Sequence, residues 1–297
     1  MLTIAIRWVI FIAAIFALGP AAAWLTSGLR AADGSAQTSL LLAASPLQGI
    51  LAGLGALVLA ALAGVAAARF IGHRSGLFVA GLVLGWAAWG LGRIDRIIGH
   101  TLSAGALYTI AVEGVLFGLL GVVLAWIILR IPSIPRAAPV RAAADDHHHH
   151  HLPPEPRELW NSAAPAAILT ALVAASIVVY LLAQDAIKGQ TIAAAAMGGI
   201  FAAAAGRVVS QRLSSVTFFA ALALLSAAAP LAASIIAGPA VVKAALSGTF
   251  FNLARPLPLD YLAGAFIGIP IGLSWAGSML ERHTPAASSA PGLAARP

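Results

Sequence analysis

Residues 101–129 read TLSAGALYTIAVEGVLFGLLGVVLAWIIL, an apolar stretch in which Glu113 is the one charged residue. A helix needs about 20 mostly apolar residues to cross a hydrocarbon core of roughly 30 Å, so this stretch is long enough to span a membrane. It lacks the alternation of apolar and polar residues that is typical of strands in membrane β-barrels. The stretch therefore predicts a transmembrane α-helix.

The rest of the chain repeats this pattern. Charge-free windows cover residues 8–29, 49–68, 75–92, 159–184, 189–206, 213–242 and 261–280. The sequence is 61% hydrophobic and 9% charged, whereas soluble domains contain roughly 25% charged residues. Because lipid offers no partners to exposed peptide groups, each window is expected to be helical. We expect an all-α, polytopic membrane helical bundle of about eight spans, with the lipid bilayer as its surroundings.

The first window has a second interpretation. Arg7, the apolar run after it and Ala21–Ala23 also fit a secretory signal peptide with a small-residue cleavage site. The apolar run is longer than a typical signal-peptide core, and the internal repeat described below requires this helix. We expect the first span to be retained.

Positive charges favour one orientation of the spans. If the N-terminus is cytoplasmic, most Arg residues, among them Arg69, Arg74 and Arg207, fall in cytoplasmic segments, as the positive-inside rule requires. We therefore expect a multi-pass inner-membrane protein with both termini in the cytoplasm. The same bias accounts for the net charge of +7. Nucleic-acid binding is not expected, because the sequence contains no compact basic domain.

A polar segment divides the chain into two halves. Residues 131–158 are rich in Pro, Ala and charged residues, and such a segment buries too little apolar surface to fold. We expect residues 1–130 and 159–282 to form two membrane halves of four spans each. Residues 131–158 would be a disordered, His-rich cytoplasmic linker between them, and residues 283–297 a disordered tail.

The two halves resemble each other. The sequence from Ala66 to Arg69, with Arg74 five residues later, lies between spans two and three. Its counterpart from Ala204 to Arg207, with Arg212, lies between spans six and seven. A duplication of four spans would give two parallel repeats related by an axis along the membrane normal. Small-residue helices with Arg-bearing hairpins also recur by chance, which is the alternative interpretation.

Small residues suggest where helices approach closely, since their packing drives association in lipid. Spans four and eight carry glycines four residues apart, namely Gly114 and Gly118 in one and Gly264, Gly268 and Gly272 in the other. We expect these two stripes to face each other across the repeat axis. Span six is nearly all Ala and Gly between Ala193 and Gly206, and we expect it to be central.

Glu113 is the principal candidate for a functional site, because an ionisable residue inside a membrane span is costly and calls for a partner. The structural alternative is a carboxyl group that hydrogen-bonds a neighbouring helix. Trp86, Trp89, Arg93 and Arg96 recur at helical spacing near the outer end of span three. This is the ordinary interfacial pattern, but Arg93 could also turn inward and pair with Glu113. We therefore expect Glu113 and Arg93, with Asp95 and Arg96 beside them, to bind a substrate.

The connection between spans seven and eight also contains aromatic and charged residues. Residues 241–251 of this connection predict an interfacial or re-entrant helix, which could form part of an outer lid.

A run of five histidines follows two aspartates in the linker: His147, His148, His149, His150 and His151. Imidazole suits zinc, copper and nickel, so weak divalent-metal binding is the functional interpretation and incidental low complexity is the alternative. No other cofactor is expected. Cysteine is absent, which excludes disulfides, thiolate nucleophiles and cysteine-bound metals.

Three classes of function remain. The first is a permease or carrier of a small solute with a site between the repeats. The second is a non-catalytic scaffold or subunit that binds other membrane proteins or further copies of this chain. The third is a membrane enzyme acting on lipid or polyprenyl substrates, with Arg93, Asp95 and Arg96 as candidates for a phosphate site. The sequence contains no GxxxxGK[ST], HExxH or GxSxG motif, so an enzyme is the least favoured class.

Overall fold

A computed structural model describes residues 2–134 and 158–283 of the chain. The histidines from His147 to His151, most of the predicted linker and the tail from residue 284 lie outside these residues. The predictions made for them therefore stay predictions.

The described residues form helices and contain no β-strand. In chain order the helices are α1 (Leu2–Ala13), a π-helical turn η1 (Ala14–Leu18), α2 (Gly19–Ser27), α3 (Pro46–Phe70), α4 (His73–Trp89), α5 (Ile94–Thr101), α6 (Gly105–Arg130), α7 (Ala164–Leu182), α8 (Lys188–Val209), α9 (Val216–Ala237), η2 (Gly238–Ala240), α10 (Val241–Leu246), η3 (Asn252–Ala254) and α11 (Pro258–His283). Eight helical segments are long and apolar enough to cross a membrane. The predicted all-α membrane bundle is thereby confirmed.

The first span is one helix with a π-helical turn in its middle. Pro20 has no N–H to donate and its ring clashes with the preceding turn of a regular α-helix. The wider turn at Ala14–Leu18 ends two residues before Pro20, and such turns are where a helix accommodates this disruption.

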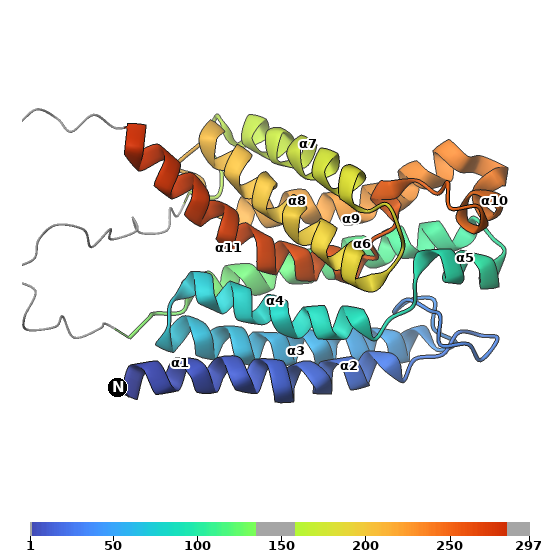
Figure 1. Ribbon diagram of the computed structural model, residues 1–297, viewed down its shortest axis with the longest axis horizontal. Coiled ribbons are helices and arrows are strands. Elements are labelled where there is room, and N and C mark those ends of the chain that lie inside the picture. The colour runs from blue at the N-terminus through green and yellow to red at the C-terminus, as the bar shows by residue number, and fades with distance from the viewer. Residues whose placement is uncertain (1, 135–157, 284–297) are drawn as a thin grey trace, which may run out of the picture.

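The bundle has two distinct ends (Figure 1). The N-terminal helix begins at the end where α11 finishes, and α5 and α10 lie together at the opposite end. We call the latter the α5–α10 end; it also carries the connecting residues 28–45 and 247–257. Each short helix follows the third span of its half, α5 after α4 and α10 after α9. Part of the expected interfacial helix at residues 241–251 is thus present as α10.

The halves exchange contacts reciprocally. Helix α6 of the first half packs mainly on α9 of the second, while α11 of the second half packs on α4 of the first as well as on α8. The glycine stripes follow these contacts. Gly114 and Gly118 face Ser226 and Ala223 of α9, and the stripe on α11 faces α8. The expectation that the two stripes face each other is therefore wrong.

Helix α8 is not the centre of the bundle. Of its span, 50% is buried, against 61% for each of the spans formed by α4–α5 and by α11. Its small residues instead permit close contact with α11, since a Cβ atom on Gly268 would lie 2.0 Å from the carbonyl oxygen of Ala196. Helix α8 packs on α11 and on α7, with few contacts to the other spans, so the expectation that span six is the centre of the bundle is wrong.

Candidate functional site

Part of the connection between α2 and α3 is inserted into the α5–α10 end. Thr38, Ser39 and Leu40 are buried, and we call residues 36–41 the plug. The backbone N–H of Gly92 donates to the carbonyl oxygen of Thr38 over 2.8 Å. Gly49 is required here, because a Cβ atom on it would lie 1.7 Å from the carbonyl oxygen of Leu40. The plug is therefore held by backbone contacts on two sides.

Glu113 lies directly beneath the plug. It is eight residues into α6 from Gly105, about 12 Å at 1.5 Å per residue. Its Oε2 atom accepts a hydrogen bond of 3.0 Å from the backbone N–H of Leu41. Its Oε1 atom and the Oγ atom of Ser39, which faces the same carboxyl group, make no hydrogen bond of acceptable geometry. Glu113 has no solvent-accessible surface, so no water-sized space adjoins it.

A buried ion pair lies close to Glu113. The Nζ atom of Lys188 donates to Oδ1 and Oδ2 of Asp260 over 3.0 and 3.2 Å, and both side chains are buried. The hydroxyl of Thr191 and the backbone N–H of Leu257 also donate to Asp260, over 3.1 and 2.9 Å. The charge of Lys188 acts on Glu113 as well. We call Glu113, Lys188, Thr191 and Asp260 the polar cluster.

Local helix chemistry positions this pair. Asp260 is the third residue of α11, and it accepts from the N–H of Leu257, the residue before the helix. This is the contact that the acidic residue of a capping box makes, and a negative charge here is stabilised by the helix dipole. Lys188 is the first residue of α8, so close packing of α8 on α11 brings the two charges together.

Arg255 lies in the connection between α10 and α11, five residues before Asp260 of the polar cluster. Its side chain is buried and donates to the carbonyl oxygens of Gln184, Gly248 and Phe250. Burial lowers the pKa of the Arg255 guanidinium, and the charges of Asp185 and Asp95 oppose this shift. The arginine thus fastens the two connections that close the α5–α10 end of the second half.

The structure separates Glu113 from its expected partner. Arg93 donates to Asp95 over 2.8 Å and lies 3.9 Å from Asp185. Arg96 is exposed on α5. The hypothesis that Arg93 pairs with Glu113 is therefore wrong in this structure. Asp95 and Arg93 form a local pair at the surface, while Glu113 belongs to the interior.

The sequence argument missed Lys188 and Asp260. Each is the residue directly before an apolar window, at 189–206 and 261–280, so hydropathy assigns both residues to the connections between spans. The sequence does contain a signal for the pair: a lysine and an aspartate directly precede two spans that begin at the same end of the bundle. Two such charges reach the same depth in adjacent helices.

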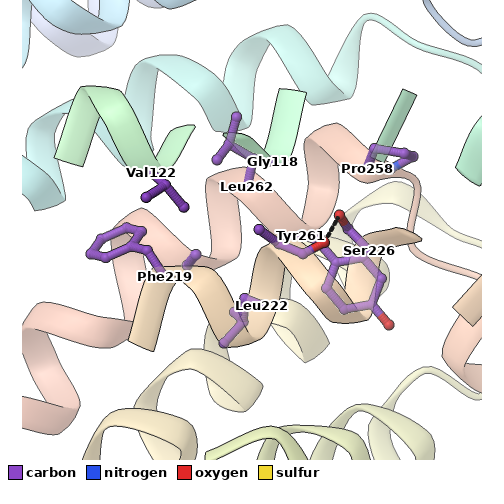
Figure 2. Close-up of a pocket in the computed structure, with 10 residues that line it drawn as sticks. Gly118, Val122, Phe219, Leu222, Ser226, Pro258, Tyr261 and Leu262 are labelled. Carbon is purple, nitrogen blue, oxygen red and sulfur yellow. Dashed lines mark hydrogen bonds between the residues drawn. The ribbon is translucent and has the colours of Figure 1, made fainter. Parts of the chain in front are cut away.

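The interface between the halves is tightly packed beside the cluster. Figure 2 shows a cavity of about 10 Å³ between α6, α9 and α11, bordered by Gly118, Leu222, Ser226 and Tyr261. The hydroxyl of Ser226 donates to the carbonyl oxygen of Ala223 over 2.7 Å. A cavity of this volume barely admits one water molecule, so it is not a solute site.

Within residues 2–134 and 158–283, no group of three or more His, Cys, Asp or Glu side chains is placed to hold a metal ion. No protein-family model, curated protein or solved structure matches this chain.

Proposed function

We propose that this integral membrane protein is a carrier of a small polar solute, and that the polar cluster is its binding site. The observation that carries the proposal is the fully buried carboxyl group of Glu113, whose Oε1 atom faces the Ser39 hydroxyl without a hydrogen bond of good geometry, beside the buried Lys188–Asp260 pair. The cluster joins α6 of the first half to α8 and α11 of the second. A solute bound there would contact both halves.

A purely structural role explains the cluster poorly. Replacing a buried ion pair by apolar residues is often neutral or stabilising, so such a pair is weak evidence for a stabilising function. Ionisable groups inside membrane proteins mark substrate and ion pathways. A solute with a hydrogen-bond donor would satisfy Glu113, and a negatively charged group on it would be attracted to Lys188.

The structure then represents a closed state. Glu113 has no accessible surface, and the plug bonds to it through Leu41. Solute access requires either movement of the plug or separation of the halves. The reciprocal packing of α6 on α9 and of α11 on α4 supports the predicted duplication, and carriers built from repeats bind their substrates between them.

The proposal is tested by a thermal-shift panel of small solutes on the detergent-purified protein. A ligand that binds only the folded state raises stability by RT ln(1 + [L]/Kd). We expect a solute that raises the Tm of the wild type and fails to raise that of Glu113→Gln. Asp33→Asn is the control, because Asp33 is an exposed carboxylate at the same end. An equal shift in wild type and Glu113→Gln would contradict the proposed site.

A scaffold that binds other membrane proteins is the second candidate. The tight packing around the cavity of about 10 Å³ favours it, because a scaffold needs no path through its interior. If the panel gives no shift with any solute at millimolar concentration, the carrier proposal fails and this candidate replaces it.

A further inference from the structure

A second candidate site lies on the membrane-facing side of the bundle. An apolar groove of about 660 Å³ lies there between α4 and α8, with Ile267 of α11 among its lining residues. Its walls include Gly85, Trp86 and Trp89 of α4 and Gly189 and Ala193 of α8. Small-molecule sites in proteins typically have volumes of about 300–1,000 Å³.

The glycines of this groove are not explained by helix packing. A Cβ atom on Gly85 would meet nothing within 4 Å, and one on Gly189 would only touch the ring of Trp89 at 3.6 Å. By contrast, a Cβ atom on Gly81, one turn away, would lie 2.8 Å from the backbone nitrogen of Ile267. Gly81 is therefore needed for close helix contact, whereas Gly85 and Gly189 keep space open.

The depth of the groove fits one leaflet. Along α8 its lining runs from Gly189, the second residue of the helix, to Ala196. Seven residues at 1.5 Å each span about 10 Å, less than half of a hydrocarbon core of roughly 30 Å. A transmembrane helix of a partner would run along the whole thickness. A lipid chain enters from one surface only, as this groove requires.

Charges of both signs lie at its polar end. Arg93 follows Trp89 by four residues and Asp185 precedes Gly189 by four. The guanidinium of Arg93 lies 3.9 Å from Asp185 and donates to Asp95 over 2.8 Å, so a phosphate would bind the face of Arg93 that Asp95 leaves open. Arg93 is 34% and Asp185 56% exposed. Arginine recognises phosphate through charge-assisted hydrogen bonds, and a carboxylate suits an ammonium group. This combination matches a zwitterionic phospholipid headgroup.

We propose that the groove binds a phospholipid with a phosphoethanolamine headgroup from the leaflet at the α5–α10 end. One of its chains lies between α4 and α8, its phosphate contacts Arg93 and its ammonium contacts Asp185. The lipid would stabilise the packing of α4 beside α8. This site is separate from the polar cluster and does not depend on the carrier proposal.

Native mass spectrometry of the purified protein, with added phosphatidylethanolamine or phosphatidylglycerol, tests the site. We expect the wild type to retain one phosphatidylethanolamine in preference to phosphatidylglycerol. Ala193→Leu fills the groove and should weaken retention at least about tenfold, a loss of about 1.4 kcal/mol. Arg93→Gln should remove the headgroup preference. Ala228→Leu, at an exposed position of α9 outside the groove, should behave as the wild type.

Equal retention by Ala193→Leu and Ala228→Leu would overturn the proposal, and so would an unchanged headgroup preference in Arg93→Gln. A second measurement covers the case in which Ala193→Leu does not fold. Phosphatidylethanolamine with brominated chains should quench Trp fluorescence less in Trp86→Phe/Trp89→Phe than in the wild type, and equal quenching contradicts the site. Ala193→Cys adds a test for a second copy, since a disulfide-linked dimer would show that another chain covers the groove instead.

Discussion

Glu113 and Asp260 are both buried carboxylates, but their surroundings differ. Asp260 accepts from Lys188, Thr191 and Leu257, whereas the Oε1 atom of Glu113 faces only the Ser39 hydroxyl, without a hydrogen bond of good geometry. A buried acceptor left without a partner costs about 1–3 kcal/mol. The Lys188–Asp260 pair therefore already has its hydrogen-bond partners, whereas Glu113 can accept a further hydrogen bond from a ligand.

The first prediction concerns the coupling of Lys188 and Asp260. Lys188→Met leaves the Asp260 charge buried without its cation, which should lower the free energy of unfolding by about 3–5 kcal/mol. Lys188→Met/Asp260→Asn should lose clearly less than Lys188→Met alone, because no charge is left uncompensated. Chemical denaturation in detergent measures both.

Lys243→Met is the control, since Lys243 is exposed on α10 and its removal should change the free energy of unfolding little. If the double variant loses as much free energy of unfolding as Lys188→Met and Asp260→Asn together, the two residues are not coupled. That result would contradict the ion pair on which the polar cluster is built.

Sequence reasoning reached Glu113 but assigned it the wrong partner, for a local reason. Trp86, Trp89, Arg93 and Arg96 share one face only if the helix continues through them. Helix α4 ends at Trp89, and Arg93 has an extended backbone as the residue before α5. The break turns Arg93 toward Asp95 at the surface. Spacing alone does not reveal such a break within an apolar run.

At the scale of elements, glycine positions decide which helices touch. The α11 stripe removes side chains where the backbone of α8 passes, at Ala196 beside Gly268 and at Ile200 beside Gly272. Close backbone approach of this kind replaces the hydrophobic effect as the cause of association in lipid. The same contact sets Lys188 against Asp260, so packing of α8 on α11 is a condition for the cluster.

The second prediction compares two glycines of α11. Gly268→Ala places a methyl group 2.0 Å from the carbonyl oxygen of Ala196, and overpacking of this kind typically costs about 1–3 kcal/mol. Gly277→Ala meets nothing within 4 Å and should be neutral or gain up to about 1 kcal/mol from helix propensity. Thermal unfolding monitored by circular dichroism distinguishes them. Equal Tm values for the two variants would refute the close α8–α11 contact.

The helices themselves were predictable, and their partners were not. Long charge-free windows permit little except spanning helices, and all eight windows overlap spans of the structure. A glycine stripe shows that some backbone comes close without showing which, so the stripes of α6 and α11 were wrongly assigned to each other. The short helices α5 and α10 contact each other at the end of the bundle, and hydropathy contains no signal for that contact.

At the scale of the whole molecule, the arrangement is reciprocal. The fourth span of each half packs on the third span of the other, and the short helix after each third span meets its counterpart. Two repeats related by an axis along the bundle would produce this pattern. Within the halves the packing differs, because α11 packs extensively on α8 whereas its counterpart α6 packs much less on α3, so the duplication stays a prediction. Which end faces the cytoplasm stays a prediction from the Arg distribution.

The carrier proposal requires that the polar cluster become exposed to water while the protein stays folded. Carriers alternate between states that expose a central site to either side. A scaffold would keep the cluster buried in every folded state. Because the chain contains no cysteine, a single cysteine can report on access without altering other positions.

The most direct test measures the labelling rate of Thr191→Cys by a membrane-impermeant maleimide added at the α5–α10 side. Thr191 and Ala203 are both buried in α8, but Thr191 contacts Asp260 and Ala203 lies in the apolar core. Thr249→Cys, exposed at the same end, sets the upper limit. The carrier proposal predicts that Thr191→Cys is labelled more slowly than Thr249→Cys but at least about tenfold faster than Ala203→Cys. A tenfold ratio means that the free energy needed to expose residue 191 is about 1.4 kcal/mol lower than that needed to expose residue 203. Equal rates for Thr191→Cys and Ala203→Cys would contradict it.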